Sequence, residues 1–328
     1  MGVSFTGGFN KVDKIGVRKG LAIAAQNNPY GDGVLLSFQS SPYSFSGLSG
    51  TQTFRLFGAG GGTGASVDDD TQASKGGDGG YAAGNLELQT SDVIEIYTGE
   101  RGLGGSFGSS GGSGGQNSFS GNDFNGGRGG NTPDVSSNGP GGGGGAATIL
   151  LFNNVVVAVA SGGGGSGGSD QSLSNTGQGG DAPSNGSVNG EDGQDGVPTS
   201  KNVNGGQGGT QTSAGTGGGN TDNQQGQNGG GSTGGSGGNV SNQNAGGGGG
   251  GGAGFFGGAG GSAAEGGMTP SQGAGGGAGS VLLPQNWSSN VADFGDQAKV
   301  PAGGSSVSGT SGGNTGSHGF AILGTADP

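Results

Sequence analysis

The sequence predicts an all-β protein, a two-layer β-sandwich with a bundle of extended glycine helices inserted between its strands. Two observations support this fold class. Short apolar or alternating segments recur along the chain and are bounded by turn residues, as expected of strands. Glycine supplies 96 of the 328 residues, and its runs stand directly beside those segments. A flexible linker would not alternate with strands in this way, so we expect the glycine runs to be folded.

Eight segments have the pattern of strands. In 51–57 polar and apolar residues alternate, which is typical of a half-buried strand. In 148–152 and 155–160 two apolar runs flank Asn153-Asn154, which predicts a hairpin. Eight strands are enough for two packed layers. The complete set of predicted strands is 34–38, 51–57, 81–89, 93–98, 148–152, 155–160, 279–283 and 319–323.

The chain divides into two predicted parts. Residues 1–50 contain the least glycine and are expected to form an N-terminal attachment segment, with a short helix over 11–25 that Gly16 and Gly20 weaken. Residues 51–328 are expected to form the glycine-rich β-sandwich domain. Its insertion, about 162–279, is a polar glycine zone with almost no strand pattern.

The glycine runs need a source of order other than a hydrophobic core. Glycine loses more backbone freedom on folding than any other residue, and this chain is poor in large apolar side chains. Glycine can, however, adopt the extended threefold polyproline II helix, which rises about 3.1 Å per residue and has no internal hydrogen bonds. Its N–H and C=O groups are then free to bond laterally. We therefore expect polyglycine II helices, with Asn, Ser, Thr and Gln at turns and rim.

Composition excludes several classes of protein. The net charge of −12 and the few basic residues argue against nucleic acid as a partner. The absence of cysteine excludes disulfides and Cys-based zinc sites and points to folding in a reducing compartment. No run approaches the ~20 apolar residues of a membrane span, so no membrane insertion is expected.

The sequence predicts no enzyme, no cofactor and no metal site. His318 is the only histidine, and the Gly-x-Ser-x-Gly patterns at 108–112 and 111–115 lack the strand-then-helix context of a nucleophile elbow. Two acidic clusters, Asp68–Asp70 and Glu191–Asp195, are interpreted as solvated loop charge. Calcium binding is the alternative for these clusters, because calcium favours carboxylate and carbonyl oxygens.

Aromatic residues supply the candidate contact sites. Phe119, Phe124, Trp287 and Phe294 stand among small polar residues, and we interpret them as receptor-binding residues of the loops 104–127 and 285–300. The alternative is that these rings fasten the loops to the sandwich. Phe255 and Phe256 interrupt the densest glycine block and are interpreted as a structural anchor, with an exposed binding tip as the alternative.

Five glycine-rich motifs occur in an order that resembles a known family. They include Phe-Arg-Leu-Phe-Gly-Ala-Gly-Gly-Gly at 54–62, and the others lie at 76–84, 141–165, 250–261 and 318–323. Over residues 51–324 the chain is similar to glycine-rich domains of phage tail and other virion proteins, and to those of the anaplastic lymphoma kinase family of receptors. The resemblance implies a tumour-necrosis-factor-like, jelly-roll-like β-sandwich with polyglycine II helices. The receptors' cysteines, signal peptide and membrane span have no counterpart here, which removes the receptor role and keeps the architecture.

Two functions of different classes follow from these observations. The first is a virion structural protein, a tail-fibre or capsid-fibre adhesin that contacts the host surface. Its expected partners are other virion proteins, further copies of itself (a trimer is the first candidate) and a host-surface receptor or glycan. The alternative is a non-viral extracellular scaffold or coat protein without a receptor. Ice binding is a third option, but the regular row of Thr or Ala that it needs is not found in the sequence.

Overall fold

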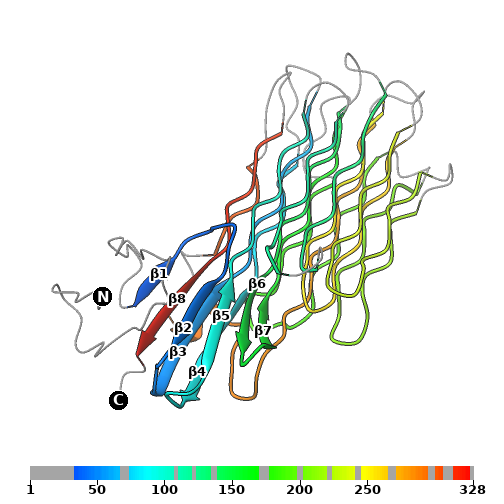
Figure 1. Cartoon of the computed structure of the whole chain (residues 1–328). Helices are drawn as coiled ribbons and strands as arrows, with labels where there is room; N and C mark the ends of the chain where they lie inside the picture. Colours follow the sequence, from blue (N-terminus) through cyan, green and yellow to red (C-terminus); the bar gives the residue numbers. More distant parts are fainter. Residues whose placement is uncertain are drawn as a thin grey trace.

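Over the residues that it describes, the computed structural model is nearly all β, with eight strands in two antiparallel sheets of four strands (Figure 1). In the part of the chain that it describes, the one helical element is a 3-10 turn, η3 (Val291–Phe294). The all-β class predicted from the sequence is confirmed. The described residues are 33–66, 74–106, 110–119, 123–133, 139–169, 177–197, 202–219, 224–240, 245–264, 271–294, 300–305 and 313–325.

The first sheet has the strand order β1-β8-β3-β4. Its strands are β1 (Val34–Leu36), β8 (Phe320–Thr325), β3 (Gly50–Phe57) and β4 (Tyr81–Leu88). Phe57 at the end of β3 lies opposite Tyr81 on one side and Phe320 on the other. The three rings pack together, with the Phe57 centroid 5.0 Å from that of Tyr81 and 4.2 Å from that of Phe320.

The second sheet has the order β2-β5-β6-β7. Its strands are β2 (Tyr43–Ser46), β5 (Val93–Tyr97), β6 (Thr148–Phe152) and β7 (Val155–Ala160). The predicted hairpin between β6 and β7 is present. Asn153 and Asn154 have φ of 49° and 66°, the positive values that a two-residue turn of this kind requires.

The main hydrophobic core combines side chains from both sheets. Phe54 and Leu56 of β3 belong to the same buried cluster as Phe45 of β2 and Ile94 and Ile96 of β5. Burial alternates along β5, as expected when one face of a strand lies on the core and the other does not. The cluster therefore ties the two sheets to one another.

The strands of the structure differ from the predicted ones in two places. Strand β2 was not predicted, because four residues with two buried aromatics give only a short signal. The predicted strand 279–283 is not a strand. It makes one bridge to β7, with two backbone hydrogen bonds between Val159 and Leu282 of 3.0 and 3.1 Å.

The predicted helix over 11–25 lies outside the described residues. In the predicted attachment segment, β1 and β2 each join one sheet, and the boundary at residue 50 stays a prediction.

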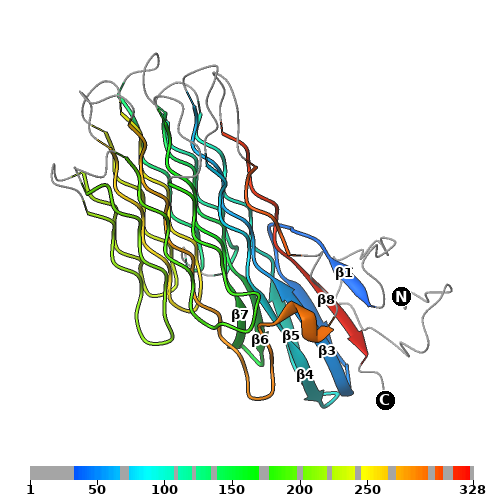
Figure 2. The same ribbon diagram turned by 180° about the vertical axis from the view of Figure 1, so that it is seen from behind.

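The glycine-rich segments run side by side and continue the strands away from the sheets (Figures 1 and 2). They are extended but form no ladder of paired strands. Their backbone groups bond instead to several different segments in turn. We refer to this assembly as the glycine array.

Segment 245–254, which contains the run of seven glycines, shows the bonding rule of the array. Every third residue bonds to the same neighbouring segment, because residues three apart point in the same direction. The N–H groups at 247 and 250 donate to segment 139–147, those at 248 and 251 to 233–240, and those at 249 and 252 to 271–280. The corresponding carbonyls accept from 161–169, 124–131 and 256–264. One segment is thus surrounded by six others.

The same pattern arranges the described segments in four layers. Five further segments also have six bonded neighbours: 58–66, 139–147, 161–169, 256–264 and 271–280. Two of them, 58–66 and 139–147, lie outside the zone 162–279 that the sequence analysis assigned to the bundle. The array is therefore wider than predicted, because glycine runs between β3 and β6 obey the same bonding rule.

The close approach of the segments explains why glycine is required. A Cβ added to Gly248 would overlap the carbonyl of Gly261, with the carbonyl carbon 2.7 Å away, and would lie 2.9 Å from the nitrogen of Gly238. These neighbours are backbone atoms and have no flexible side chain that could move aside. The segments with six neighbours consequently consist mainly of glycine, alanine and serine, with Thr63 and Gln272 among the larger buried residues.

Candidate functional site

Trp287, interpreted from the sequence as a receptor-binding residue, is buried, which favours the alternative that its ring fastens the loop. Its side chain is 9 % exposed and belongs to the main core cluster. Its Nε1 donates a hydrogen bond of 3.2 Å to the carbonyl of Asn85, and its ring stacks 6.5 Å from that of Phe54. A Cβ at Gly84 would lie 2.6 Å from Nε1, so this glycine makes room for the ring. Trp287 therefore fastens its segment to β4.

Phe124 and Phe119 pack against the second sheet. Phe124 is 7 % exposed and shares a cluster with Ile149 and Leu151, which again favours a fastening role over a receptor contact. Phe119 is half-buried and lies edge-on between Tyr97, at 5.3 Å, and Phe124, at 5.8 Å. The aromatic pair thus holds its loop on β5 and β6. A receptor contact through the exposed part of Phe119 stays a prediction.

The remaining aromatic candidates are placed less completely. Phe294 is the last residue of η3, and its side chain lies outside the described residues. Phe255 and Phe256 are half-buried and pack edge to face on one another, with centroids 4.9 Å apart. Their backbones bond to Ser280: its carbonyl accepts from Phe255 at 2.8 Å, and its N–H donates to Phe256 at 2.9 Å. Their predicted anchor role stays a prediction.

His318 takes part in packing. Its ring stacks on that of Phe38 at 4.4 Å, and its Nδ1 accepts a hydrogen bond of 3.3 Å from the backbone N–H of Arg101. Burial, and then the positive charge of Arg101, lower the pKa of His318 below its ordinary value. The neutral imidazole is thereby favoured, as the accepting Nδ1 requires.

The described residues contain no group of three or more His, Cys, Asp or Glu side chains that could hold a metal ion. Of the two acidic clusters considered for calcium, Asp68–Asp70 lies outside these residues. Within the same ranges, no helix is long and apolar enough to cross a bilayer.

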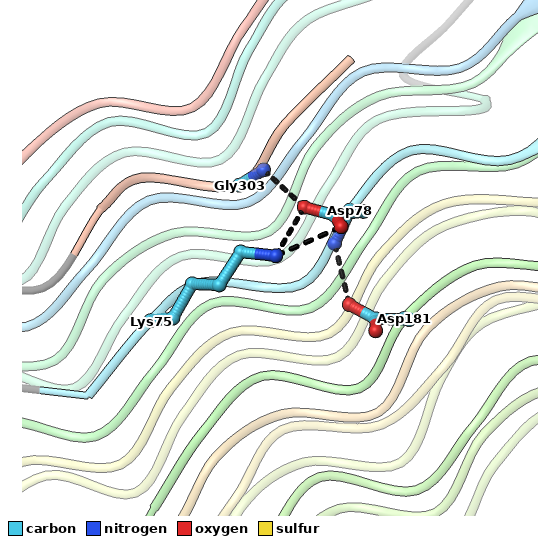
Figure 3. Close-up of polar contacts among 4 residues, drawn as sticks. All are labelled: Lys75, Asp78, Asp181 and Gly303. Atoms are coloured by element: carbon cyan, nitrogen blue, oxygen red, sulfur yellow. Dashed lines mark hydrogen bonds and ion pairs between the residues drawn. The ribbon is translucent and has the colours of Figure 1, made fainter. Parts of the chain in front are cut away.

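One outer layer of the array carries five described acidic side chains, Asp78, Asp181, Glu191, Asp192 and Asp195, and we call its outside the acidic face. It consists of the segments 300–305, 74–80, 177–183 and 190–197. Lys75 forms an ion pair with Asp78, with its Nζ 2.7 Å from Oδ1 and 2.8 Å from Oδ2 (Figure 3). The Asp78 carboxylate also accepts the N–H of Gly303 at 2.8 Å, and the N–H of Asp78 donates to Asp181 Oδ1 at 2.7 Å.

Two carboxyl groups of the acidic face have raised pKa values. Burial is the main cause for Asp181, and the negative charge of Asp78 adds to it, while the N–H of Asp78 and the charge of Lys75 act in the opposite direction. Burial also raises the pKa of Glu191, with a further contribution from the charge of Asp181. Burial therefore explains most of both shifts, and close carboxylates on adjacent segments add to it.

The opposite outer layer presents mainly uncharged polar side chains, and we call its outside the neutral face. It consists of the segments 110–117, 124–131, 233–240 and 224–230. The exposed residues on these segments are amides and hydroxyls apart from one cation, Arg128. They are Ser110, Ser113, Gln116, Gln225, Gln227, Asn228, Asn239 and Arg128. The two faces of the array therefore differ in charge.

Side-chain oxygens bond to backbone N–H groups around the rim of the array. A segment at the edge of the array, in an outer layer or at the end of an inner one, lacks a neighbour on at least one side, so a donor there needs another partner. The side chain of an adjacent segment supplies it, and we call these side chains rim caps. The pairs are Asp192 with Gly208 (2.7 Å), Asp195 with Gly205 (2.8 Å), Asn228 with Gly217 (2.8 Å), Asn131 with Gly111 (2.9 Å) and Asn239 with Asn131 (2.8 Å).

The rim caps were missed in the sequence, where Asp192 and Asp195 were interpreted as solvated charge. Both are exposed, but each accepts a backbone hydrogen bond. The sequence contains a signal for the outward-facing positions of outer segments, but not for Asp192 and Asp195, which stand in Glu-Asp-Gly-Gln-Asp-Gly at 191–196. The outer segments contain triplets of one larger residue followed by two glycines, such as Lys-Gly-Gly-Asp-Gly-Gly at 75–80 and Asn-Gly-Gly-Arg-Gly-Gly at 125–130. The larger residue of each triplet is the one that faces outward.

Comparison with known proteins does not assign the chain to a group. No model of a protein family matches it, and no curated protein is similar enough in sequence to count as a relative.

Proposed function

We propose that the protein is a virion structural protein, a tail-fibre or capsid-fibre adhesin in which a polyglycine II bundle is mounted on a β-sandwich. The observation that carries this proposal is the three-residue bonding rule of segment 245–254, with six neighbours around one segment. Threefold extended helices without internal hydrogen bonds have this periodicity. The core cluster shared by both sheets supports the sandwich.

The architecture suits a part that holds its shape outside a cell. Its order depends on lateral backbone bonds, which need neither disulfides nor a large hydrophobic core. The neighbouring carboxylates of Asp78 and Asp181 accept backbone hydrogen bonds, and Asp78 also forms an ion pair with Lys75. They are not arranged as an acid and a base around a cavity. A non-catalytic, load-bearing role is consistent with this arrangement.

We place the host contact on the neutral face. Its amide and hydroxyl groups stand on adjacent segments at three-residue intervals, so they offer hydrogen bonds on a regular, nearly uncharged surface. A glycan is recognised through many such bonds to its hydroxyl groups. The acidic face, in contrast, would repel an anionic cell surface.

A specific observation also supports the alternative, an extracellular scaffold or coat protein without a receptor. The burial of Trp287 and Phe124 removes two of the four aromatic contacts that the sequence suggested for a receptor. A coat protein would need the rigid array and no contact residues.

Two measurements test the proposal. Mass spectrometry of purified virus particles should detect the protein, whereas recovery only from an extracellular matrix or coat fraction would support the scaffold. Attachment to host cells should then fall for Ser113→Glu with Gln225→Glu on the neutral face. The matched control, Ala302→Glu with Gln194→Glu on the acidic face, changes the net charge equally. Equal attachment by both variants would refute the assignment of the contact to the neutral face.

A further inference from the structure

The rim of the array has the bonding groups of an open edge. In the interior, each backbone N–H from Gly247 to Ala253 donates to a carbonyl of a neighbouring segment at 2.8–3.0 Å. At the rim the same kind of donor points to a position that no further segment of the described residues fills. An edge of this type can add another chain, as an exposed edge strand of a sheet does.

At one corner, two carboxylates stand where the carbonyls of a further segment would stand. The N–H groups of Gly205 and Gly208 donate to Asp195 and Asp192 at 2.8 and 2.7 Å. Donors and acceptors are each three residues apart, which is the interval of the bonds inside the array. The two side chains therefore imitate one missing segment.

At a second corner the same device uses an amide. The N–H of Gly217 donates to Asn228 Oδ1 at 2.8 Å. Because an uncharged side chain performs the same task, the common property of these residues is the acceptor oxygen and not the negative charge.

The segment that would fit in place of the caps is closely defined. Nearly every described glycine inside the array has a backbone carbonyl so close that an added Cβ would overlap it. Only a chain with glycine at the facing positions could approach to hydrogen-bonding distance. The outer segments of this protein have that composition, as the triplets at 75–80 and 125–130 illustrate.

We infer that Asp192, Asp195 and Asn228 close the rim against an outer glycine-rich segment of a second copy of this chain. The rim is thus a latent interface between copies, blocked by three side-chain acceptors. The inference depends on the bonding pattern alone and does not require that the protein belong to a virion.

The test compares variants that separate the acceptor from the charge. The uncapped variant is Asp192→Ala, Asp195→Ala, Asn228→Ala, and the capped control is Asp192→Asn, Asp195→Asn, which loses the same two charges but keeps the oxygens. A second control removes exposed side chains of the rim for which the structure shows no hydrogen bond to a backbone N–H. It is the variant Gln194→Ala, Gln225→Ala, Gln227→Ala. Sedimentation velocity measures the mass of each full-length variant against concentration, and hydrogen exchange follows the peptides around 205–208 and 217.

At low concentration we expect the uncapped variant to exchange these amides faster, by about three- to tenfold, the size expected for the loss of one hydrogen bond. At high concentration its average mass should exceed that of the wild type, and the same amides should regain protection. Both controls should behave as the wild type.

Association of the uncapped variant and of the capped control to the same extent would show that charge keeps copies apart and would overturn the inference. An uncapped variant with wild-type mass at all concentrations would overturn it too. If the triple variant does not fold, Asn228→Ala alone provides the same comparison at one corner.

Discussion

The replacement Gly248→Ala is expected to destabilise the protein strongly although it adds only one methyl group. The new Cβ would overlap the carbonyl of Gly261 and lie 2.9 Å from the nitrogen of Gly238. Separating these segments weakens the bonds from Gly248 N–H to Gly238 (3.0 Å) and from Gly261 N–H to Gly249 (2.9 Å). A buried group left without its partner costs roughly 1–3 kcal/mol. Two such losses give about 2–6 kcal/mol, a large part of the usual stability of ~5–15 kcal/mol.

Gly231→Ala provides the matched control. No atom lies within 4 Å of a Cβ added at Gly231, and this glycine is exposed. Since alanine restricts the unfolded chain more than glycine does, this change should be neutral or stabilise by about 0.4–1 kcal/mol. Denaturant unfolding of both variants, followed by circular dichroism and tryptophan fluorescence, measures the difference. Equal unfolding midpoints for Gly248→Ala and Gly231→Ala would refute the close-packed array.

Two further predictions concern the acidic face and the core. Asp181→Asn should raise the melting temperature at neutral pH. The pKa of the Asp181 carboxyl is raised in the folded protein, so folding stability is lost as the pH rises through its titration. Asparagine keeps the oxygen that accepts the Asp78 N–H but carries no charge. The advantage should shrink as the pH falls through the carboxyl range in thermal melts; an advantage independent of pH would contradict the burial of this charge. Trp287→Ala should cost about 3–5 kcal/mol, as for other buried aromatic truncations, and more than Phe119→Ala, whose ring is half-buried. Unchanged unfolding of Trp287→Ala together with lost attachment to host cells would restore its role as a receptor contact.

The sequence predicted the parts of the fold that have local signals. Alternation identified β3, and the Asn153-Asn154 pair identified the turn between β6 and β7. Glycine content and its position beside strands indicated that the runs are ordered. These signals arise within a few residues, so one sequence is sufficient to read them.

The arrangement of the segments could not be predicted in the same way. Gly247 donates to Gly139, more than one hundred residues earlier, and neither glycine has a side chain that could specify the other. The burial of Trp287 depends on the space over Gly84, which is distant in sequence. The rim caps needed knowledge of which segments lie outermost. Only the three-residue spacing of larger residues indicated which side of a segment faces outward. This spacing is interrupted where long glycine runs contain no larger residue.

The position of β8 in the first sheet determines when the protein can fold during synthesis. β8 lies between β1 and β3, so β1 pairs with a strand nearly three hundred residues later in the chain. Until residues 320–325 have left the ribosome, β3 has one open side and β1 has no partner in this sheet. β1 and the open side of β3 therefore stay unpaired until β8 has been synthesised, whereas β3 can already pair with β4. An interrupted translation product would retain the glycine runs but present the edge of β3 to other chains.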